Sequence, residues 1–490
     1  MLNRSISRWE MVLLFMNGVI GAGIFGLPSK AFKEIGVYSI VALLVCAVTV
    51  FIIIICLAEV SSRFDKTGGP YLYASSAFGP FTGFITGWLL LLTRFITFAA
   101  LVNLMVTYLS VFSGWFAQPL SRIITIVSIT LFLAFINHVG VRNTTRVNNF
   151  LTIAKLLPLF LFIGVGIFFL EPGNFEIKYT PDFSSFSSTV LLLVFAFGGF
   201  ESILVNTGEV KNPKKNLPFA LLLASSAIVV IYMLIQIVSI GTLPGLASSE
   251  KPLAEAAGLF MGKTGATIIA IGALFSITGT LNAVMLVGSR LPYAFSEEKQ
   301  LPRFLSFIHP KFKTPTWSLL LFTAITLVVS ITNSFIYAAT ISAITRVMIY
   351  GIVCVALIRL RNKDAVETGF FKIPYGKFIA VAGILVTIWL LSSSKLNELR
   401  DVAIAVSVGL IIYFLKSIRK IILKSKFNYY LLNILISLLI WGSISVIFSI
   451  NTKQGIISYI VSYVVSTIIF FMIAPYEKVR KAHLKNKTLL

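Results

Sequence analysis

Apolar segments of roughly 20 residues recur along the whole chain, and they constrain its fold more than any other feature. A helix of about 20 apolar residues is long enough to cross the hydrocarbon core of a bilayer. Only 12% of the 490 residues are charged, about half the share that is typical of a soluble domain. Backbone polar groups in lipid must be hydrogen-bonded within the protein, which favours helices. The sequence therefore predicts an all-α integral membrane protein.

Fourteen membrane spans are predicted from the apolar segments, and the twelfth is the shortest. Cytoplasmic loops of membrane proteins are enriched in Lys and Arg, and most of the 41 such residues fall in alternate loops. This pattern predicts cytoplasmic N- and C-termini and a multi-pass protein of a bacterial inner membrane or a plasma membrane. The predicted spans cover residues 9–31, 37–62, 80–112, 121–138, 147–170, 187–209, 217–243, 264–289, 316–334, 337–358, 377–393, 402–416, 427–449 and 456–474.

The charge and the cysteines argue against several other functions. A net charge of +23 would suggest nucleic-acid binding in a soluble protein, but here the basic loops and tail account for it, and they would attract anionic lipids. Cys46, Cys56 and Cys354 lie inside apolar spans and lack the spacing of a metal site. The sequence has no dinucleotide loop, P-loop or HExxH motif. We therefore expect no enzyme, no cofactor, no metal site and no nucleic-acid partner.

Two spans carry glycines where a membrane helix should be continuous. The segment from Gly18 to Pro28 has four glycines within nine residues, and Gly198 and Gly199 interrupt the sixth span. Each glycine weakens a helix by about 1 kcal/mol relative to alanine. Close packing of small residues is one explanation. The other is unwound backbone, which is tolerated at membrane depth only where it is buried in protein or lines a cavity.

The placement of the two interruptions favours unwound backbone. Glycine-interrupted spans at corresponding positions of two halves indicate the binding site of a secondary transporter. The first and sixth spans would open the halves of a five-plus-five inverted repeat. The N-termini of the half-helices would then face a carboxylate of the substrate, and freed carbonyl groups would receive its ammonium group.

Five motifs together resemble the amino acid–polyamine–organocation family of permeases, from residue 9 to about residue 361. The resemblance implies the LeuT-type fold, with substrate between spans one, three, six, eight and ten. It implies a transport core over 1–361. Beyond this core, the apolar and basic segments predict spans eleven and twelve with basic cytoplasmic loops over 362–426, and two further spans with a basic tail over 427–490, two more than many relatives have. The motifs are Gly18 to Pro28, Gly68 to Tyr71, Phe195 to Glu201, Gly208 to Pro218, and Ser289-Arg290 with His309 to Pro315.

The resemblance also implies which residues contact the substrate. The unwound part of the first span would bind the α-carboxylate and α-amino groups. Phe195 aligns with an aromatic residue that covers the substrate in relatives, and Gly198 aligns with a position in the side-chain pocket. The residues expected at the site are Ile20, Gly21, Ala22, Gly23, Ile24, Phe195, Ala196, Phe197 and Gly198.

Ionisable residues inside spans are functional candidates, because a charged side chain there costs at least ~2.5 kcal/mol on insertion scales. In proton-coupled or sodium-independent family members, a lysine at the place of Lys155 occupies the position of a sodium ion. By resemblance, Lys155 would connect the broken first helix to spans five and eight, either as a fixed cation or while exchanging a proton. Glu201 follows the second interruption. It could carry a proton or hydrogen-bond the unwound backbone.

Two arginines and a carboxylate complete the set of charges within or near spans. Arg94 in span three could contact an anionic substrate group, pair with a carboxylate such as Glu201, or lie off the pathway. Arg346 in span ten is a candidate for a gate or a cytoplasmic-side lock. Glu59, near the end of span two, is expected to pair with Arg63 four residues later.

The sequence thus predicts sodium-independent amino acid transport by proton symport or exchange. A polyamine or organic amine carrier is the second possibility, although it would require more acidic residues at the site than Glu201. A third is a non-transporting amino-acid sensor or a subunit that depends on a partner. No covalent accessory chain is expected, because the segment from Ser113 to Arg122 contains no cysteine.

Overall fold

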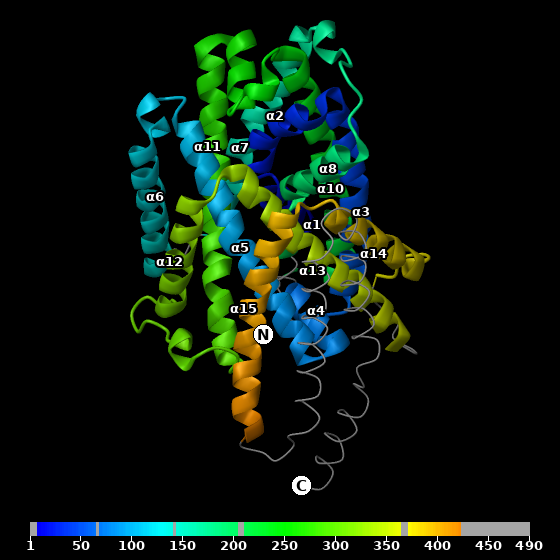
Figure 1. Ribbon diagram of the computed structural model, residues 1–490, viewed down its shortest axis with the longest axis vertical. Coiled ribbons are helices and arrows are strands. Elements are labelled where there is room, and N and C mark those ends of the chain that lie inside the picture. Colours follow the sequence, from blue (N-terminus) through cyan, green and yellow to red (C-terminus); the bar gives the residue numbers. More distant parts are fainter. Residues whose placement is uncertain (1–6, 65–67, 141–143, 204–209, 364–370, 423–490) are drawn as a thin grey trace.

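The computed structural model of the protein describes residues 7–64, 68–140, 144–203, 210–363 and 371–422, and every regular element in these ranges is a helix. The long helices α5, α6, α11, α12 and α15 run roughly along the long axis of the molecule (Figure 1). The first seven helices are α1 (Arg8–Val19), α2 (Gly23–Ile35), α3 (Ser39–Ser62), α4 (Gly69–Phe78), α5 (Pro80–Leu109), α6 (Pro119–Val139) and α7 (Thr144–Gly166).

The second half of the described chain continues the all-helical bundle. Its helices are α8 (Phe183–Phe197), α9 (Phe200–Ile203), α10 (Pro213–Thr242), α11 (Pro252–Glu297), α12 (Thr316–Thr332), α13 (Phe335–Lys363), α14 (Gly376–Ser392) and α15 (Leu396–Ile422). Short 3₁₀ helices lie in the connections: η1 (Gly36–Tyr38), η2 (Gly114–Ala117), η3 (Ile167–Phe169), η4 (Pro172–Phe175), η6 (Leu246–Ser248) and η7 (Arg303–Ser306).

Several described helices are suited to cross a membrane. Six are long and apolar enough, and a seventh span results if α14 and α15, which bend by 112° at their junction, count as one. Three shorter apolar segments also occur, at Lys155–Phe169, Phe183–Phe197 and Thr316–Thr332. These helices agree with a multi-pass membrane protein. The count of fourteen spans and the inverted repeat remain predictions, and the spans at 427–449 and 456–474 lie outside the described residues.

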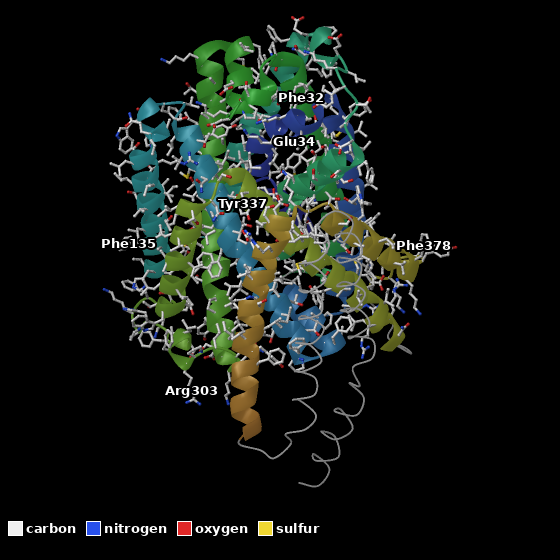
Figure 2. All side chains as sticks on the ribbon, viewed as in Figure 1. Phe32, Glu34, Phe135, Arg303, Tyr337 and Phe378 are labelled. Carbon is white, nitrogen blue, oxygen red and sulfur yellow. The ribbon has the colours of Figure 1, made fainter. Side chains whose placement is uncertain are left out.

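Apolar side chains cover the flanks of the bundle. Phe135 on α6 is 64% exposed and Phe378 on α14 is 74% exposed, and both point outward from the molecule in Figure 2. Arg303 in η7 lies at one end of the bundle instead. A soluble monomer rarely exposes so many large apolar residues, whereas lipid chains solvate them. The exposed surface therefore agrees with helices that stand in a bilayer.

Helix α5 lies at the centre of the described helices, where it packs against α11, α12 and α13. Most of its residues from Thr82 to Tyr108 are buried, including Arg94 and Asn103. Helix α4 was not among the predicted spans. This ten-residue helix begins at Gly69, and Pro70 suits its first turn, because the missing N–H of proline costs no hydrogen bond there.

A buried carboxylate joins α3 to α13 at the end of both helices. The predicted pair of Glu59 and Arg63 is present, with Arg63 Nη2 lying 2.8 Å from Glu59 Oε1. The sequence did not indicate the second partner, Arg361, which donates from Nε at 2.7 Å and from Nη2 at 2.5 Å to the two oxygens of Glu59. The backbone N–H of Ile373 also donates to this carboxylate, at 2.9 Å. Glu59 thus connects α3, α13 and the segment before α14.

We predict that Glu59→Gln lowers the free energy of unfolding by about 3 kcal/mol. Breaking a buried ion pair costs ~3–5 kcal/mol, and the partial exposure of Arg361 favours the lower end of this range. The measurement is thermal unfolding of the purified protein in detergent. Glu34→Gln, at an exposed position of α2, is the matched control and should leave the melting temperature unchanged. Equal melting temperatures for the two variants would contradict the structural role of Glu59.

Candidate functional site

The first predicted interruption is present as a break between α1 and α2. The residues Ile20, Gly21 and Ala22 are not helical, and α2 begins at Gly23. The N-cap of α2, Ala22, supplies no side-chain hydrogen bond. The first N–H groups of a helix have no acceptor within the helix, and they carry the positive end of its dipole. The start of α2 is therefore suited to bind an anionic group.

The carbonyl groups of the first break are held by a buried lysine. Lys155 of α7 is 2% exposed, and its Nζ donates to the carbonyl oxygens of Asn17 and Ile20, both at 2.6 Å. Ser276 of α11 also donates to the carbonyl of Ile20, at 3.2 Å. Lys155 and Ser276 thus connect the unwound backbone to α7 and α11. The hydrogen bonds from Lys155 replace the helical partners that these carbonyl groups lose at the break.

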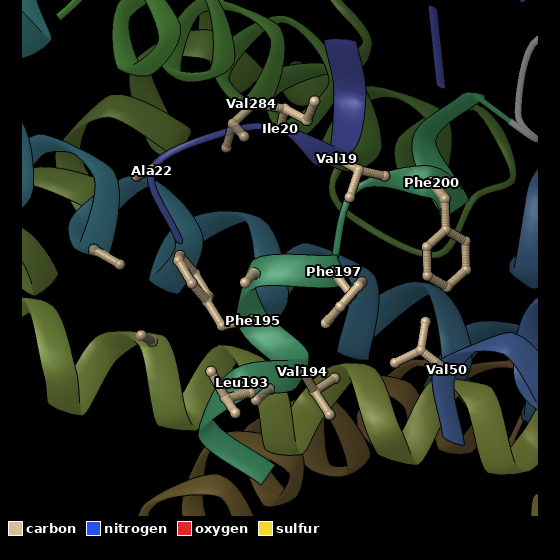
Figure 3. Packing of buried hydrophobic residues seen from close by; sticks show 14 of the residues in the cluster. Val19, Ile20, Ala22, Val50, Leu193, Val194, Phe195, Phe197, Phe200 and Val284 are labelled. Carbon is tan, nitrogen blue, oxygen red and sulfur yellow. The ribbon is translucent and has the colours of Figure 1, made fainter. Parts of the chain in front are cut away.

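The second predicted interruption separates α8 from α9 at Gly198 and Gly199. Gly199 has a φ of +121°, a conformation that residues with a side chain rarely adopt. The two breaks lie against each other. Figure 3 shows the stretch from Val19 to Ala22 close to the last turn of α8, which carries Phe195 and Phe197.

Contacts on both sides hold the two breaks together. A Cβ atom built at Gly23 would lie 2.6 Å from the Cα of Ala196, so only a glycine permits this approach. The hydroxyl of Tyr232 of α10 lies between the breaks and donates to the carbonyl oxygens of Val19, at 3.3 Å, and Ala196, at 3.1 Å. The broken ends of the two helices therefore form one site.

A buried charge cluster lies next to the second break. The carboxylate of Glu201 forms an ion pair with Arg346 of α13 and lies 3.6 Å from Nη2 of Arg94 of α5. It accepts hydrogen bonds from the N–H of Gly199 at 2.9 Å and from the hydroxyl of Tyr350 at 3.2 Å. All three charged residues are at most 4% exposed. Of the alternatives for Arg94, pairing with Glu201 is present, and Glu201 does hydrogen-bond the unwound backbone.

Arg346 is held in place on two further sides. Its Nη2 donates to Thr97 at 3.2 Å and its Nε to Ser342 at 3.3 Å. Its guanidinium group also lies on the backbone of Gly198, where a Cβ atom would come within 2.5 Å of Nη1. Gly198 therefore makes room for Arg346 beside the second break.

A cavity lies between the two breaks, and its volume is about 90 Å³. A single water needs roughly 10–15 Å³ by the same measure, so the cavity has room for a small solute. Of the predicted site residues, Gly21, Ala22, Gly23, Phe195, Gly198, Arg94 and Arg346 line it. The other predicted site residues are buried but are not among the described residues that line the cavity: Ile20, Ile24, Ala196, Phe197, Lys155 and Glu201.

Residues of α5 and α11 also line the cavity and were missed by the sequence analysis. They include Thr97, one turn after Arg94, and Gly279-Thr280 in the eighth predicted span. Small polar residues one turn from a buried arginine, or in the middle of an otherwise apolar span, were the signal that could have identified them.

A second, larger cavity of about 410 Å³ lies further along α5. Leu101 of α5 lines the first cavity and Leu104 lines the second, which is a rise of about 4.5 Å along a helix. Phe195 lines the first cavity and Phe335 lines the second. Their rings meet edge to face with centroids 6.1 Å apart. This aromatic pair lies between the two cavities.

The sequence is similar to those of known permeases over most of its length. A family model described as amino acid permease matches residues 6–397. The serine/threonine exchanger SteT of Bacillus subtilis is 27% identical over 84% of this chain and 95% of its own length. The branched-chain amino acid permease BcaP of the same organism is 26% identical over 85% of this chain and 93% of its own. The small subunit 2 of the human large neutral amino acids transporter is 30% identical over 71% and 68%.

We predict that Gly198→Ala lowers the free energy of unfolding by about 1–3 kcal/mol, the range for overpacking a filled site. The added methyl group would displace the guanidinium of Arg346. Gly164→Ala in α7 is the matched control, because no atom lies within 4 Å of its added Cβ, and it should not destabilise the protein. Thermal unfolding in detergent measures both. A Gly198→Ala variant as stable as the wild type would show that Arg346 is not confined by this glycine.

Proposed function

Because the chain belongs to the amino acid permease family, we propose that it is a secondary transporter that carries amino acids across a cell membrane by alternating access. The observation that carries this proposal is the cavity between two facing helix breaks. Broken helices at the middle of a bundle supply free backbone groups for a substrate and a hinge for the movement of one bundle against the other. The family and the named relatives are transporters, not enzymes.

The unwound backbone would bind the groups that all amino acids share. The N–H groups of Gly23 and Ile24 at the start of α2 would hold the α-carboxylate, because the next two, those of Phe25 and Gly26, already donate to the carbonyl of Ala22 and because this end of α2 is the positive end of its dipole. Carbonyl groups of both breaks would receive the α-ammonium group. Phe195, which meets Phe335 at the boundary of the second cavity, would cover the bound substrate. Ile20, Ile24, Ala196 and Phe197 would set the positions of these groups.

Lys155 supports transport without sodium. Its ammonium group occupies the place between two backbone carbonyls of the first break, and such carbonyls are the ligands that a sodium ion takes in transporters with broken helices. A fixed or exchangeable positive charge at this point would therefore replace the ion. We propose that Lys155 exchanges a proton during the cycle and couples transport to the proton gradient.

Glu201, Arg94 and Arg346 would couple the second break to the rest of the bundle. Their ion pairs join the segment after α8 to α5 and α13. When the broken helices move, this network must rearrange as a unit, because a buried charge without a partner is costly. The transport core over 1–361, and cytoplasmic positions for both termini, remain part of the same proposal.

A carrier of polyamines is disfavoured by the charges at the cavity. The described lining of the cavity includes two arginines and no carboxylate. Such a lining would repel a polycation. A sensor without transport activity would share the site, so only a transport measurement separates it from a carrier.

The test is uptake of labelled amino acids and amines by the purified protein in sodium-free liposomes, with and without an inward proton gradient. Accumulation driven by the gradient is the expected result. Uptake only into preloaded liposomes would establish an exchanger instead. No movement of any compound in either condition would contradict transport and support the sensor.

We predict that Lys155→Arg abolishes gradient-driven accumulation but retains exchange of internal for external substrate. Arginine preserves the positive charge at the first break, yet it does not release its proton in a protein. Both modes are measured in the same liposomes. Lys263→Arg, at an exposed position of α11, is the control and should behave as the wild type. Undiminished accumulation by Lys155→Arg would show that the lysine is a fixed cation.

A further inference from the structure

The second cavity lies at the end of the bundle where α5 ends and α13 begins. Its described lining includes Thr107 near the end of α5, Ile331 near the end of α12 and Phe335 at the start of α13. With the cytoplasmic termini proposed above, α5 runs outward as the third span, so this is the external end of the bundle. A solute from outside would therefore reach the second cavity before the first.

Charged side chains of both signs line the second cavity. Lys30 of α2 and Arg122 of α6 are cationic, and Glu250, which precedes α11, is anionic. In the described part of the chain, no ion pair joins Glu250 to either cation. Opposite charges thus face one cavity without contacting each other. A ligand that carries both a carboxylate and an ammonium group is complementary to such a wall.

The guanidinium group of Arg122 is held in position from one side. Its Nη2 donates to Oδ1 of Asn103 of α5 at 2.8 Å. Asn103 is 2% exposed and donates its own amide to the carbonyl groups of Ala99 and Ser330, both at 2.9 Å. Of the described residues, only Asn103 accepts a hydrogen bond from Arg122. Because a guanidinium group has five N–H donors in a planar fork, donors remain for the carboxylate of a ligand.

Lys30 and Glu250 supply a second donor and an acceptor to the same cavity. Nζ of Lys30 donates to the carbonyl of Ser249, the residue before Glu250, at 3.4 Å. This contact is long for a hydrogen bond and uses one of the three N–H donors of the ammonium group. Glu250 is exposed, so its carboxylate is accessible to a solute. The wall therefore presents groups for both charges of one small molecule.

From these contacts we infer that the second cavity is a second binding site for an amino acid in its zwitterionic form. The α-carboxylate binds to Arg122 and Lys30, and the α-ammonium group binds to Glu250. The cavity has a volume of about 410 Å³, against about 90 Å³ for the first, so one further amino acid fits without displacing the first. This inference rests on the proposed transport function and deepens it.

The ring of Phe335 separates the two sites. It meets Phe195 edge to face, with centroids 6.1 Å apart, and it packs on Gly26 of α2, where an added Cβ would lie 2.7 Å from Cε1 of the ring. Passage from the second site to the first requires this ring to move. An amino acid in the second site would therefore wait on the outer side of Phe335 while another occupies the first, and one protein would hold two molecules.

The experiment counts bound amino acids on the purified protein in lipid nanodiscs. Each of the twenty standard amino acids is first tested by thermal shift, and the one that raises the melting temperature most is used in labelled form. Equilibrium dialysis then gives the number of molecules bound at saturation. Two molecules per protein are expected for the wild type.

Variants assign the second molecule to the charged wall. Lys30→Gln and Glu250→Gln should each raise the dissociation constant of one of the two molecules at least roughly tenfold, the effect of one charge-assisted hydrogen bond, and leave the other unchanged. Lys33→Gln is the matched control, because Lys33 is exposed on the same helix and is not among the described residues that line the cavity. Arg122 is left in place, because its bond to Asn103 joins α6 to α5.

Analogues of the same amino acid test whether both charges are read. The methyl ester lacks the carboxylate charge, and the N-acetyl derivative lacks the ammonium charge. Neither should displace the second molecule at concentrations at which the unlabelled amino acid does. Displacement by the N-acetyl derivative as effective as by the amino acid itself would show a site for anions and overturn the zwitterionic assignment.

The outcomes separate this inference from the proposed function. A single bound molecule on a wild-type protein that transports amino acids overturns the second site and leaves transport intact. Two molecules bound with unchanged affinity by both Lys30→Gln and Glu250→Gln overturn the assignment to these charges. Failure to bind or move any amino acid overturns the proposed function and the inference together.

Discussion

The rest of the site depends on the ion pairs and hydrogen bonds of the Glu201 carboxylate. It accepts the N–H of Gly199 in the second break and pairs with Arg94 and Arg346 from two long helices. Removing such a group from water is costly unless it is paired and hydrogen-bonded on all sides. The surrounding helices therefore have to meet at this point. This arrangement accounts for the position of the second break, the packing of Arg346 on Gly198 and the charge of the cavity wall.

Lys155 performs the corresponding task at the first break. Its two hydrogen bonds take carbonyl groups that have lost their helical partners and tie them to α7. Each break thus contacts one buried ion. The ammonium group of Lys155 binds carbonyl groups freed by the first break, and the carboxylate of Glu201 accepts an N–H freed by the second. The signs follow from the backbone, because carbonyl oxygens attract a positive charge and N–H groups a negative one. Such paired arrangements allow broken helices to persist away from water.

Glycine makes the two breaks mutually compatible. The approach of Gly23 to Ala196 and of Gly198 to Arg346 would be blocked by any Cβ atom, and Gly199 adopts a backbone conformation that favours glycine. The two explanations that the sequence left open, close packing and unwound backbone, are therefore both present at the same residues. The helices unwind where they also pack closely, and the cavity lies beside the contact.

The sequence by itself determined the helical class and the places of both breaks, because these follow from local hydrophobicity and from the low helix propensity of glycine. It also placed Lys155, Glu201, Arg94 and Arg346 inside spans. It left the partners of these charges open, and it did not identify Arg361 as a ligand of Glu59 or Thr97 and Thr280 as cavity residues. Only the tertiary structure decided those, because they are contacts between residues far apart in the sequence, such as Glu201 with Arg346, 145 positions away, or depend on which face of a helix is turned inward. The hydropathy of a helix determines whether it lies in the bilayer, whereas its packing against neighbouring helices determines which side chains are in contact.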